Sequence, residues 1–322
     1  MPKSRKLSIL AAILLLAAAI GLFFYFRASQ PPEAARLLPE GDFVFYANLK
    51  PVHLLDLSKS GPVQLEGDYK DFVAQTGIQF ERDLEEIAMS RRDTPDHRDV
   101  ESSEIFVGRF DPVPLENYLW TLAGGALEKY RDHTIYSISH EGHTVRVSVL
   151  DNRRVAVTNM ASPEPMHGIV DRAYKPTRGP WLLTAHYHDV PLTSLAWLIY
   201  RIPNQPDSVQ LPGGFGFDLP PDTIAVGSLR YTGSLLFRAD VFAQSEVQAK
   251  QITESANTHL ALVRSIGQAM GSRGPDQDIK AAFDSIHVEQ KENAAVFTAT
   301  IPQSLIKKIW SEVRTEGAAP AR

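Results

Sequence analysis

One run of twenty residues without a charged side chain, LSILAAILLLAAAIGLFFYF, begins at Leu7 and ends at Phe26. At a rise of about 1.5 Å per residue, a helix of this length matches the roughly 30 Å hydrocarbon core of a bilayer. Lys3, Arg5 and Lys6 precede the run, and basic residues favour the cytoplasmic side of a membrane. The sequence therefore predicts a cytoplasmic stub, a transmembrane helix inserted in the lipid bilayer, and an extracytoplasmic remainder.

A cleaved secretory signal is the alternative interpretation of this run. Signal peptides have shorter apolar regions, of about 7–15 residues, and end at small residues. Cleavage after Ala28 would leave Phe26 three residues before the cut, and cleavage after Ser29 would leave Arg27 there. Neither residue is small, so an uncleaved anchor is favoured. A lipoprotein is excluded because the chain has no cysteine.

Composition limits the class of protein further. The chain has no cysteine and no Asn-x-Ser/Thr sequon, which excludes disulfides, thiolate nucleophiles and Cys-ligated zinc. A bacterial envelope protein needs neither feature, so we predict a single-pass protein of the bacterial inner membrane. Without Lys3, Arg5, Lys6 and Arg27, the 33 basic residues fall to 29 against 38 acidic residues, a net charge of about −9. This balance argues against a nucleic-acid partner.

Four strand-like apolar runs each lie ahead of a proline and a helix-like run of leucines, at residues 43–49, 105–110, 181–187 and 296–301. Proline suits the first turn of a helix, because its φ is fixed and it has no N–H to leave unpaired. Each junction therefore predicts a strand followed by a helix.

A Val-Pro-Leu tripeptide with a tryptophan five residues later occurs twice. The two copies are Val113-Pro114-Leu115 with Trp120, and Val190-Pro191-Leu192 with Trp197. Chance among common residues is one explanation. We favour a duplication, with related halves at residues 37–175 and 180–314.

Strand-like runs on either side of short turns predict three antiparallel hairpins, and Val145, Val147 and Val149 alternate with polar residues in the first of them. They pair residues 134–139 with 143–150, 223–231 with 235–242, and 286–290 with 295–301. A long amphipathic helix is predicted from about Ser245 to Met270. This pattern predicts an α+β fold with antiparallel sheets and helices packed on one face. Residues 27–36 are predicted to be a stiff spacer and 315–322 a disordered tail.

Histidines are the candidate metal ligands in a chain without cysteine. His186 and His188 are two residues apart on a predicted strand and would share one face. His140 and His143 flank a predicted hairpin turn. A zinc or copper site would require the two pairs to converge with a carboxylate. The alternative is that both pairs are solvated. No HExxH motif is present, and no cofactor is predicted.

Residues 202–222 (IPNQPDSVQLPGGFGFDLPPD) are rich in proline and glycine and predict an unusually long irregular loop. The glycines lack the flanking strand, helix and lysine of a phosphate-binding loop. Phe215 and Phe217 either pack into the core of the domain or present an apolar contact to a partner protein or to the bilayer.

The chain resembles uncharacterised, singly anchored bacterial envelope proteins with a duplicated α+β extracytoplasmic domain. Three segments carry the resemblance: Leu38-Pro39-Glu40-Gly41-Asp42, Thr76-Gly77-Ile78, and Tyr130 leading into Ile135-Tyr136. It covers about residues 38–314 and implies a location and an architecture, without an activity.

We therefore expect a membrane-tethered, non-catalytic extracytoplasmic domain that binds another envelope component, either a protein or a polymer. One alternative is a metal- or carboxylate-dependent hydrolase of envelope material that uses the face carrying His186 and His188. A second alternative is a carrier that holds an apolar ligand between sheet and helices.

Overall fold

The computed structural model describes residues 30–51, 67–93, 100–140, 142–202, 207–211, 215–269, 277–306 and 308. The predicted transmembrane helix, the cytoplasmic stub and the C-terminal tail lie outside these ranges. No helix within them is long and apolar enough to cross a membrane.

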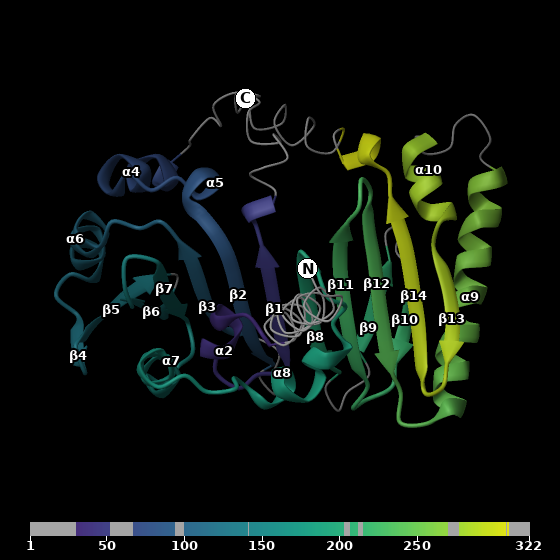
Figure 1. Cartoon of the computed structure of the whole chain (residues 1–322), viewed down its shortest axis with the longest axis horizontal. Coiled ribbons are helices and arrows are strands. Elements are labelled where there is room, and N and C mark those ends of the chain that lie inside the picture. Colours follow the sequence, from purple (N-terminus) through teal and green to yellow (C-terminus); the bar gives the residue numbers. More distant parts are fainter. Residues whose placement is uncertain are drawn as a thin grey trace, which may run out of the picture.

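Antiparallel strands dominate the molecule (Figure 1). They are β1 (Phe43–Asn48), β2 (Leu84–Asp93), β3 (Val100–Gly108), β4 (Leu127–Tyr130), β5 (His133–His140), β6 (His143–Val149), β7 (Arg154–Thr158), β8 (Ala196–Arg201), β9 (Asp207–Leu211), β10 (Phe215–Leu219), β11 (Ile224–Tyr231), β12 (Leu235–Phe242), β13 (His287–Lys291) and β14 (Ala294–Ile301). Twelve of them form one sheet in the order β13-β14-β12-β11-β8-β1-β2-β3-β7-β6-β5-β4. β9 and β10 form a separate hairpin.

Helices pack against this sheet. They are α2 (Glu33–Leu37), α4 (Gly67–Thr76), α5 (Phe80–Asp83), α6 (Pro112–Ala123), α7 (Glu164–Tyr174), α8 (Trp181–His186), α9 (Glu246–Ala269) and α10 (Gln277–Asp284), with a 3-10 turn, η1 (Tyr187–Asp189). A large antiparallel sheet with helices confirms the predicted α+β class.

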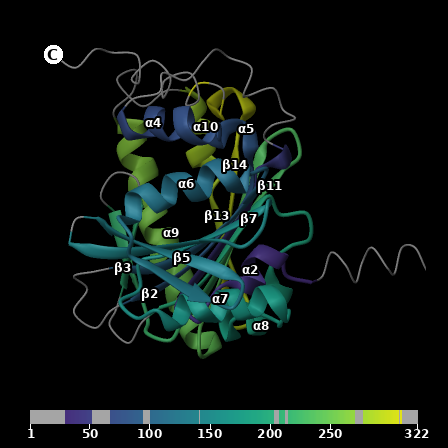
Figure 2. The ribbon, with the colours of Figure 1, turned by 90° about the vertical axis from the view of Figure 1, so that its left-hand side faces the viewer.

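Helices cover both faces of the sheet, so the prediction that they pack on one face is wrong. Ile105 of β3 lies in the core cluster formed with α2, α7 and α8, whereas the next residue, Phe106, packs in the cluster that includes Leu115 and Leu119 of α6. Successive residues of a strand point to opposite faces. The consecutive apolar residues of β3 therefore need cover on both sides. Figure 2 shows α2, α7 and α8 on one side of the sheet and α4 and α6 on the other.

The three predicted hairpins are confirmed as β5–β6, β11–β12 and β13–β14, and the long amphipathic helix is α9. Two other predictions are wrong. Residues 181–186 form a helix and not the predicted strand. The prediction failed because a short apolar run such as WLLTAH has no periodicity that distinguishes a strand from a helix. The expected irregular loop at 202–222 contains the β9–β10 hairpin.

The predicted spacer at residues 27–36 overlaps α2. Ala34, Ala35 and Leu37 of this helix are buried in the main core cluster. Two prolines ahead of a polar-looking EAAR sequence suggested a linker, but its alanines pack against β1, β2 and β3. The folded part therefore begins close to the end of the predicted anchor.

Near the middle of the sheet lies the antiparallel pair of β1 and β8, each preceded by a short helix. Outward from β1 the order is β2, β3, β7 and β6, and outward from β8 it is β11, β12, β14 and β13. On each side the first two of these strands form one hairpin and the next two another. β5 and β4 extend the β1 side further and, in the described part of the chain, have no counterpart beyond β13. The Val-Pro-Leu tripeptides do not occupy matching places, since the first lies in α6 and the second follows η1.

Candidate functional site

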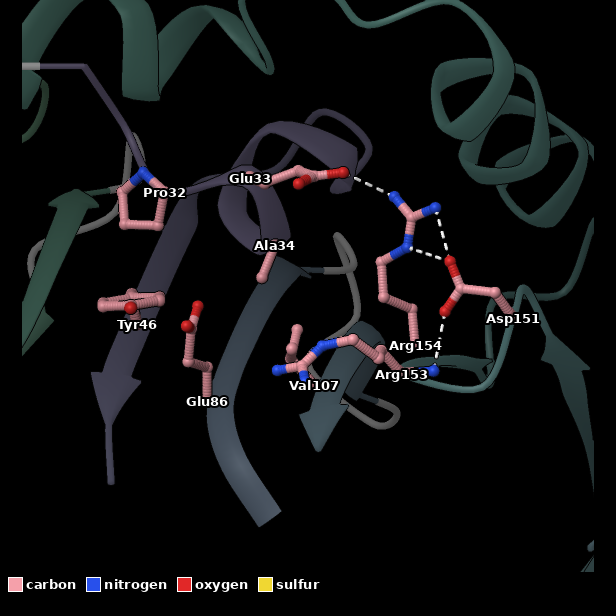
Figure 3. Close-up of a pocket in the computed structure, with 9 residues that line it drawn as sticks. All are labelled: Pro32, Glu33, Ala34, Tyr46, Glu86, Val107, Asp151, Arg153 and Arg154. Carbon is pink, nitrogen blue, oxygen red and sulfur yellow. Dashed lines mark hydrogen bonds and ion pairs between the residues drawn. The ribbon is translucent and has the colours of Figure 1, made fainter. Parts of the chain in front are cut away.

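A cleft of about 510 Å³ lies beside α2, on the sheet face that α2, α7 and α8 cover. Its walls come from the start of α2, from β1, β2 and β3, and from the turn between β6 and β7 (Figure 3). The lining residues are Pro32, Glu33, Ala34, Tyr46, Glu86, Val107, Asp151, Arg153 and Arg154. Strand pairing and the β6–β7 turn bring these residues together from distant parts of the sequence.

Arg154 joins the two sides of the cleft. Its guanidinium donates to Glu33 Oε1 through Nη1 at 2.5 Å, and to Asp151 Oδ2 through Nε at 2.8 Å. Asp151 also accepts from the backbone N–H of Arg153 at 2.8 Å, which fixes the turn. Burial acts against the Asp151 carboxylate, but the bonds from Arg154 and the backbone outweigh it and lower its pKa. The side chain of Arg154 is only 20% exposed, so it acts as an internal clamp.

A second charged group lies where β1 and β2 pair. Lys50 Nζ donates to Glu86 Oε1 at 2.7 Å and lies 3.4 Å from Glu85 Oε2, which also accepts from Arg153 Nη2 at 2.6 Å. Burial would raise the pKa of Glu85, but Arg153 and Lys50 together lower it. The hydrogen bond to Glu86 is the main cause that raises the pKa of Lys50.

Aromatic side chains form the apolar part of this region. Tyr46 stacks on Trp197 with ring centroids 5.5 Å apart, and Tyr187 meets Trp197 edge-on at 5.4 Å. Tyr46 also forms a side-chain hydrogen bond with Glu86. Burial, followed by the charge and hydrogen bond of Glu86, holds the pKa of Tyr46 well above its usual range. The phenol therefore stays protonated and can donate a hydrogen bond.

The cleft combines charged groups of both signs with a buried phenol. The shifted groups are moved away from neutrality: the pKa values of Asp151 and Glu85 are lowered, and that of Tyr46 is raised. Charges of both signs and a buried phenol suit a ligand that carries polar or ionic groups.

The structure separates the two predicted histidine pairs. His186 ends α8 and His188 lies in η1, so they do not share a strand face as expected. Both contact Asp189, through His186 Nδ1 to Oδ2 at 3.4 Å and His188 Nε2 to Oδ1 at 3.3 Å.

His140 and His143 face each other across the end of the β5–β6 hairpin, and both are exposed. β6 lies four strand spacings, or about 19 Å, from β1, on which α8 packs. Within the described ranges, no three His, Asp or Glu side chains are grouped so that they could hold a metal ion. A metal at either pair remains a prediction.

Phe215 and Phe217 lie in β10, opposite Leu211 and Val209 of β9. The predicted contact of these phenylalanines with a partner remains a prediction.

Sequence reasoning did not single out the residues of the cleft. The one local signal was the DNRR sequence at 151–154, which places a carboxylate and two guanidiniums between two alternating strands. Tyr46 and Glu86 gave no signal, because only the pairing of β1 with β2 brings them together.

No protein-family model matches this sequence, and no curated protein matches it. Solved structures of the treponemal protein TP0453 are similar to this chain. Crystal form I has a TM-score of 0.45 at 13% identity, and covers 88% of this chain and 98% of its own. Crystal form III has a TM-score of 0.46 at 13% identity, with 88% and 99% covered. This similarity is too low to support any conclusion about function.

Proposed function

We propose that the chain is a membrane-tethered, extracytoplasmic domain of the bacterial cell envelope that binds another envelope component through the cleft beside α2. The observation that carries this proposal is the cleft itself, with its paired charges, its buried tyrosine and its volume of about 510 Å³. Pro32 and Glu33, which line the cleft, follow closely on the apolar run that ends at Phe26. The cleft would therefore lie near the membrane surface.

The lining favours a polar ligand over an apolar one. Five of its nine residues are charged: Glu33, Glu86, Asp151, Arg153 and Arg154. An apolar ligand would remove these groups from water without offering hydrogen bonds in return, and this is unfavourable. The apolar-carrier alternative therefore has less support than binding of a protein segment or a polymer with polar groups.

The hydrolase alternative also has less support. It would need histidines and carboxylates in one cleft, but the two histidine pairs lie on separate elements and neither pair lines the cleft.

We further propose that the chain arose by duplication, as the matching strand orders on either side of the β1–β8 pair suggest. The helix–strand units α2–β1 and α8–β8 would be equivalent. On this proposal the first half begins at α2 rather than at residue 37, and the second begins at α8.

Site-directed photo-crosslinking of the full chain in living cells tests the binding proposal. A benzophenone amino acid at Glu33, whose side chain is 61% exposed at the rim, is expected to give a discrete adduct. The same amino acid at the exposed Asn117 of α6, on the other face of the sheet, is the control and is expected to give none.

The role of the cleft charges is tested in the same experiment. Arg153→Gln should weaken the adduct from position 33, whereas Lys250→Gln should leave it unchanged. Lys250 is the control because it also pairs with a carboxylate, Glu254, on α9, away from the cleft. Equal adducts from positions 33 and 117, or an adduct unaffected by Arg153→Gln, would contradict the proposal.

A further inference from the structure

The segment that joins α7 to α8, residues 174–181 (YKPTRGPW), has an unusual surface. Tyr174 and Trp181, at its ends, are 47% and 56% exposed, and residues 175–178 between them are exposed as well. Tyrosine and tryptophan are usually at least partly buried, and two exposed ones on one short segment favour a contact surface. We call this segment the 174–181 linker.

Basic residues accompany the aromatic ones. Lys175 and Arg178 form no ion pair with any residue of the described ranges, and both are exposed. Arg131 lies over the ring of Tyr174 at 5.3 Å. Asp132 accepts from the Tyr174 hydroxyl and keeps its charge, whereas Asp171 pairs with Arg131. The linker itself holds two basic residues and no acidic one, in a part of the chain whose net charge is about −9.

The linker is fixed against α2. Gly179 has φ +92°, and a Cβ atom there would lie 3.0 Å from Cα of Arg36. The backbone N–H of Trp181 donates to the Glu40 carboxylate at 2.9 Å, and Arg172 Nε donates to the carbonyl oxygen of Leu37 at 2.8 Å. The aromatic and basic side chains are therefore presented by a rigid support beside the first helix of the folded part.

The position of α2 limits how far this surface lies from the predicted anchor. Six residues, 27–32, separate the apolar run from α2, and even fully extended they span only about 20 Å. α2 itself adds about 7.5 Å. Tyrosine and tryptophan favour the membrane–water interface, and lysine and arginine near the surface are attracted to anionic lipid.

We infer that the 174–181 linker contacts the lipid headgroups of the membrane that anchors the chain, and so sets the orientation of the folded part on the bilayer. The inference rests on the proposed tether. Another exposed tryptophan, Trp120, is 60% exposed on α6, which covers the opposite face of the sheet (Figure 2). α6 contains no lysine or arginine, so charge favours the linker as the lipid-facing surface.

The absence of natural cysteine makes the test direct. The full chain is reconstituted into vesicles of phosphatidylethanolamine and phosphatidylglycerol, with a bimane fluorophore on Thr177→Cys or on the control Asn117→Cys. Lipids that carry a nitroxide on the headgroup quench a fluorophore that touches them. Strong quenching at position 177 and little at 117 is expected.

Charge is tested in the Thr177→Cys background. Lys175→Glu with Arg178→Glu should reduce quenching about twofold or more, because each basic side chain contributes to attraction to an anionic surface. Vesicles of phosphatidylcholine alone should reduce it similarly. Circular dichroism of each variant shows whether its fold is retained.

Retention in the vesicles after alkaline extraction tests the tether separately. A chain that is retained, but whose position 177 is quenched no more than position 117, overturns the lipid contact and leaves the tether standing. A chain that is extracted overturns both.

Discussion

Among single residues, Arg154 is the most constrained side chain of the cleft. It lies between Glu33 and Asp151 and is mostly buried. Arg154→Ala should lower the free energy of unfolding by about 1–3 kcal/mol, because Asp151 would keep a partly buried carboxylate without its main partner. Urea denaturation measures this change.

The control for Arg154→Ala is Arg131→Ala, which breaks a pair with Asp171 whose side chains are 49% and 43% exposed. Exposed pairs contribute about 0–1 kcal/mol. If both variants lost the same free energy of unfolding, Arg154 would not act as a clamp.

The lowered pKa values of Asp151 and Glu85 predict how stability changes with pH. A carboxyl group whose pKa is lower in the folded state stabilises the fold above its unfolded pKa, and this stabilisation is lost as pH falls through the folded value. The ordinary values are 3.8 and 4.5, so the free energy of unfolding should fall only below about pH 4.5. Asp151→Asn should make that fall shallower in urea titrations at successive pH values. If the free energy of unfolding of Asp151→Asn fell as steeply in acid as that of the unchanged protein, the pairing of Asp151 with Arg154 would be contradicted.

The cleft could not be predicted from the sequence, because its lining residues come from distant parts of the chain. Glu86 and Tyr46 are far apart in sequence, and only the antiparallel register, with Glu86 opposite Asn48, brings them near each other. A β-bulge between Leu84 and Glu86 adds a further local shift that alternation does not reveal.

At the scale of elements, the linker is expected to depend on Gly179. Gly179→Ala places a Cβ 3.0 Å from the Arg36 backbone at a φ of +92°. Gly142→Ala, at φ +84° with nothing within 4 Å, imposes similar backbone strain without the contact. Thermal unfolding should show Gly179→Ala to be the more destabilising, by about 1 kcal/mol or more. Equal effects would mean that the linker is not packed on α2.

Elements with strong local patterns were predictable, and short ambiguous ones were not. β11 and β12 are two mostly apolar runs of eight residues on either side of a Thr-Gly turn, and this pattern predicted their hairpin. α8 is six residues long, and its buried pair Leu182 and Leu183 fits a strand or a helix equally well. Coverage of both sheet faces follows from consecutive apolar residues in β3, a signal that was present but was not used.

At the scale of the whole molecule, one twelve-stranded sheet runs through the described part of the chain, and the β1–β8 pair lies near its middle. Trp197 of β8 is 3% exposed and stacks on Tyr46 of β1. Trp197→Ala should lower the free energy of unfolding by about 3–5 kcal/mol. Hydrogen exchange should show that β5 and β14, which lie near opposite ends of the sheet, lose protection together.

Trp120→Ala is the control for Trp197→Ala, because an exposed side chain usually changes stability by no more than about 0.5 kcal/mol. If only one end of the sheet lost protection from hydrogen exchange, the sheet would not unfold as a single cooperative unit.

The measurement that tests the central claim most directly is protease digestion of cells that express the full chain. We predict that external protease cuts the chain in spheroplasts, leaving a fragment in the membrane, and that intact cells protect it. A chain that resists protease in spheroplasts and is cut only after lysis would place the folded part in the cytoplasm. That result would contradict an envelope domain tethered through residues 7–26.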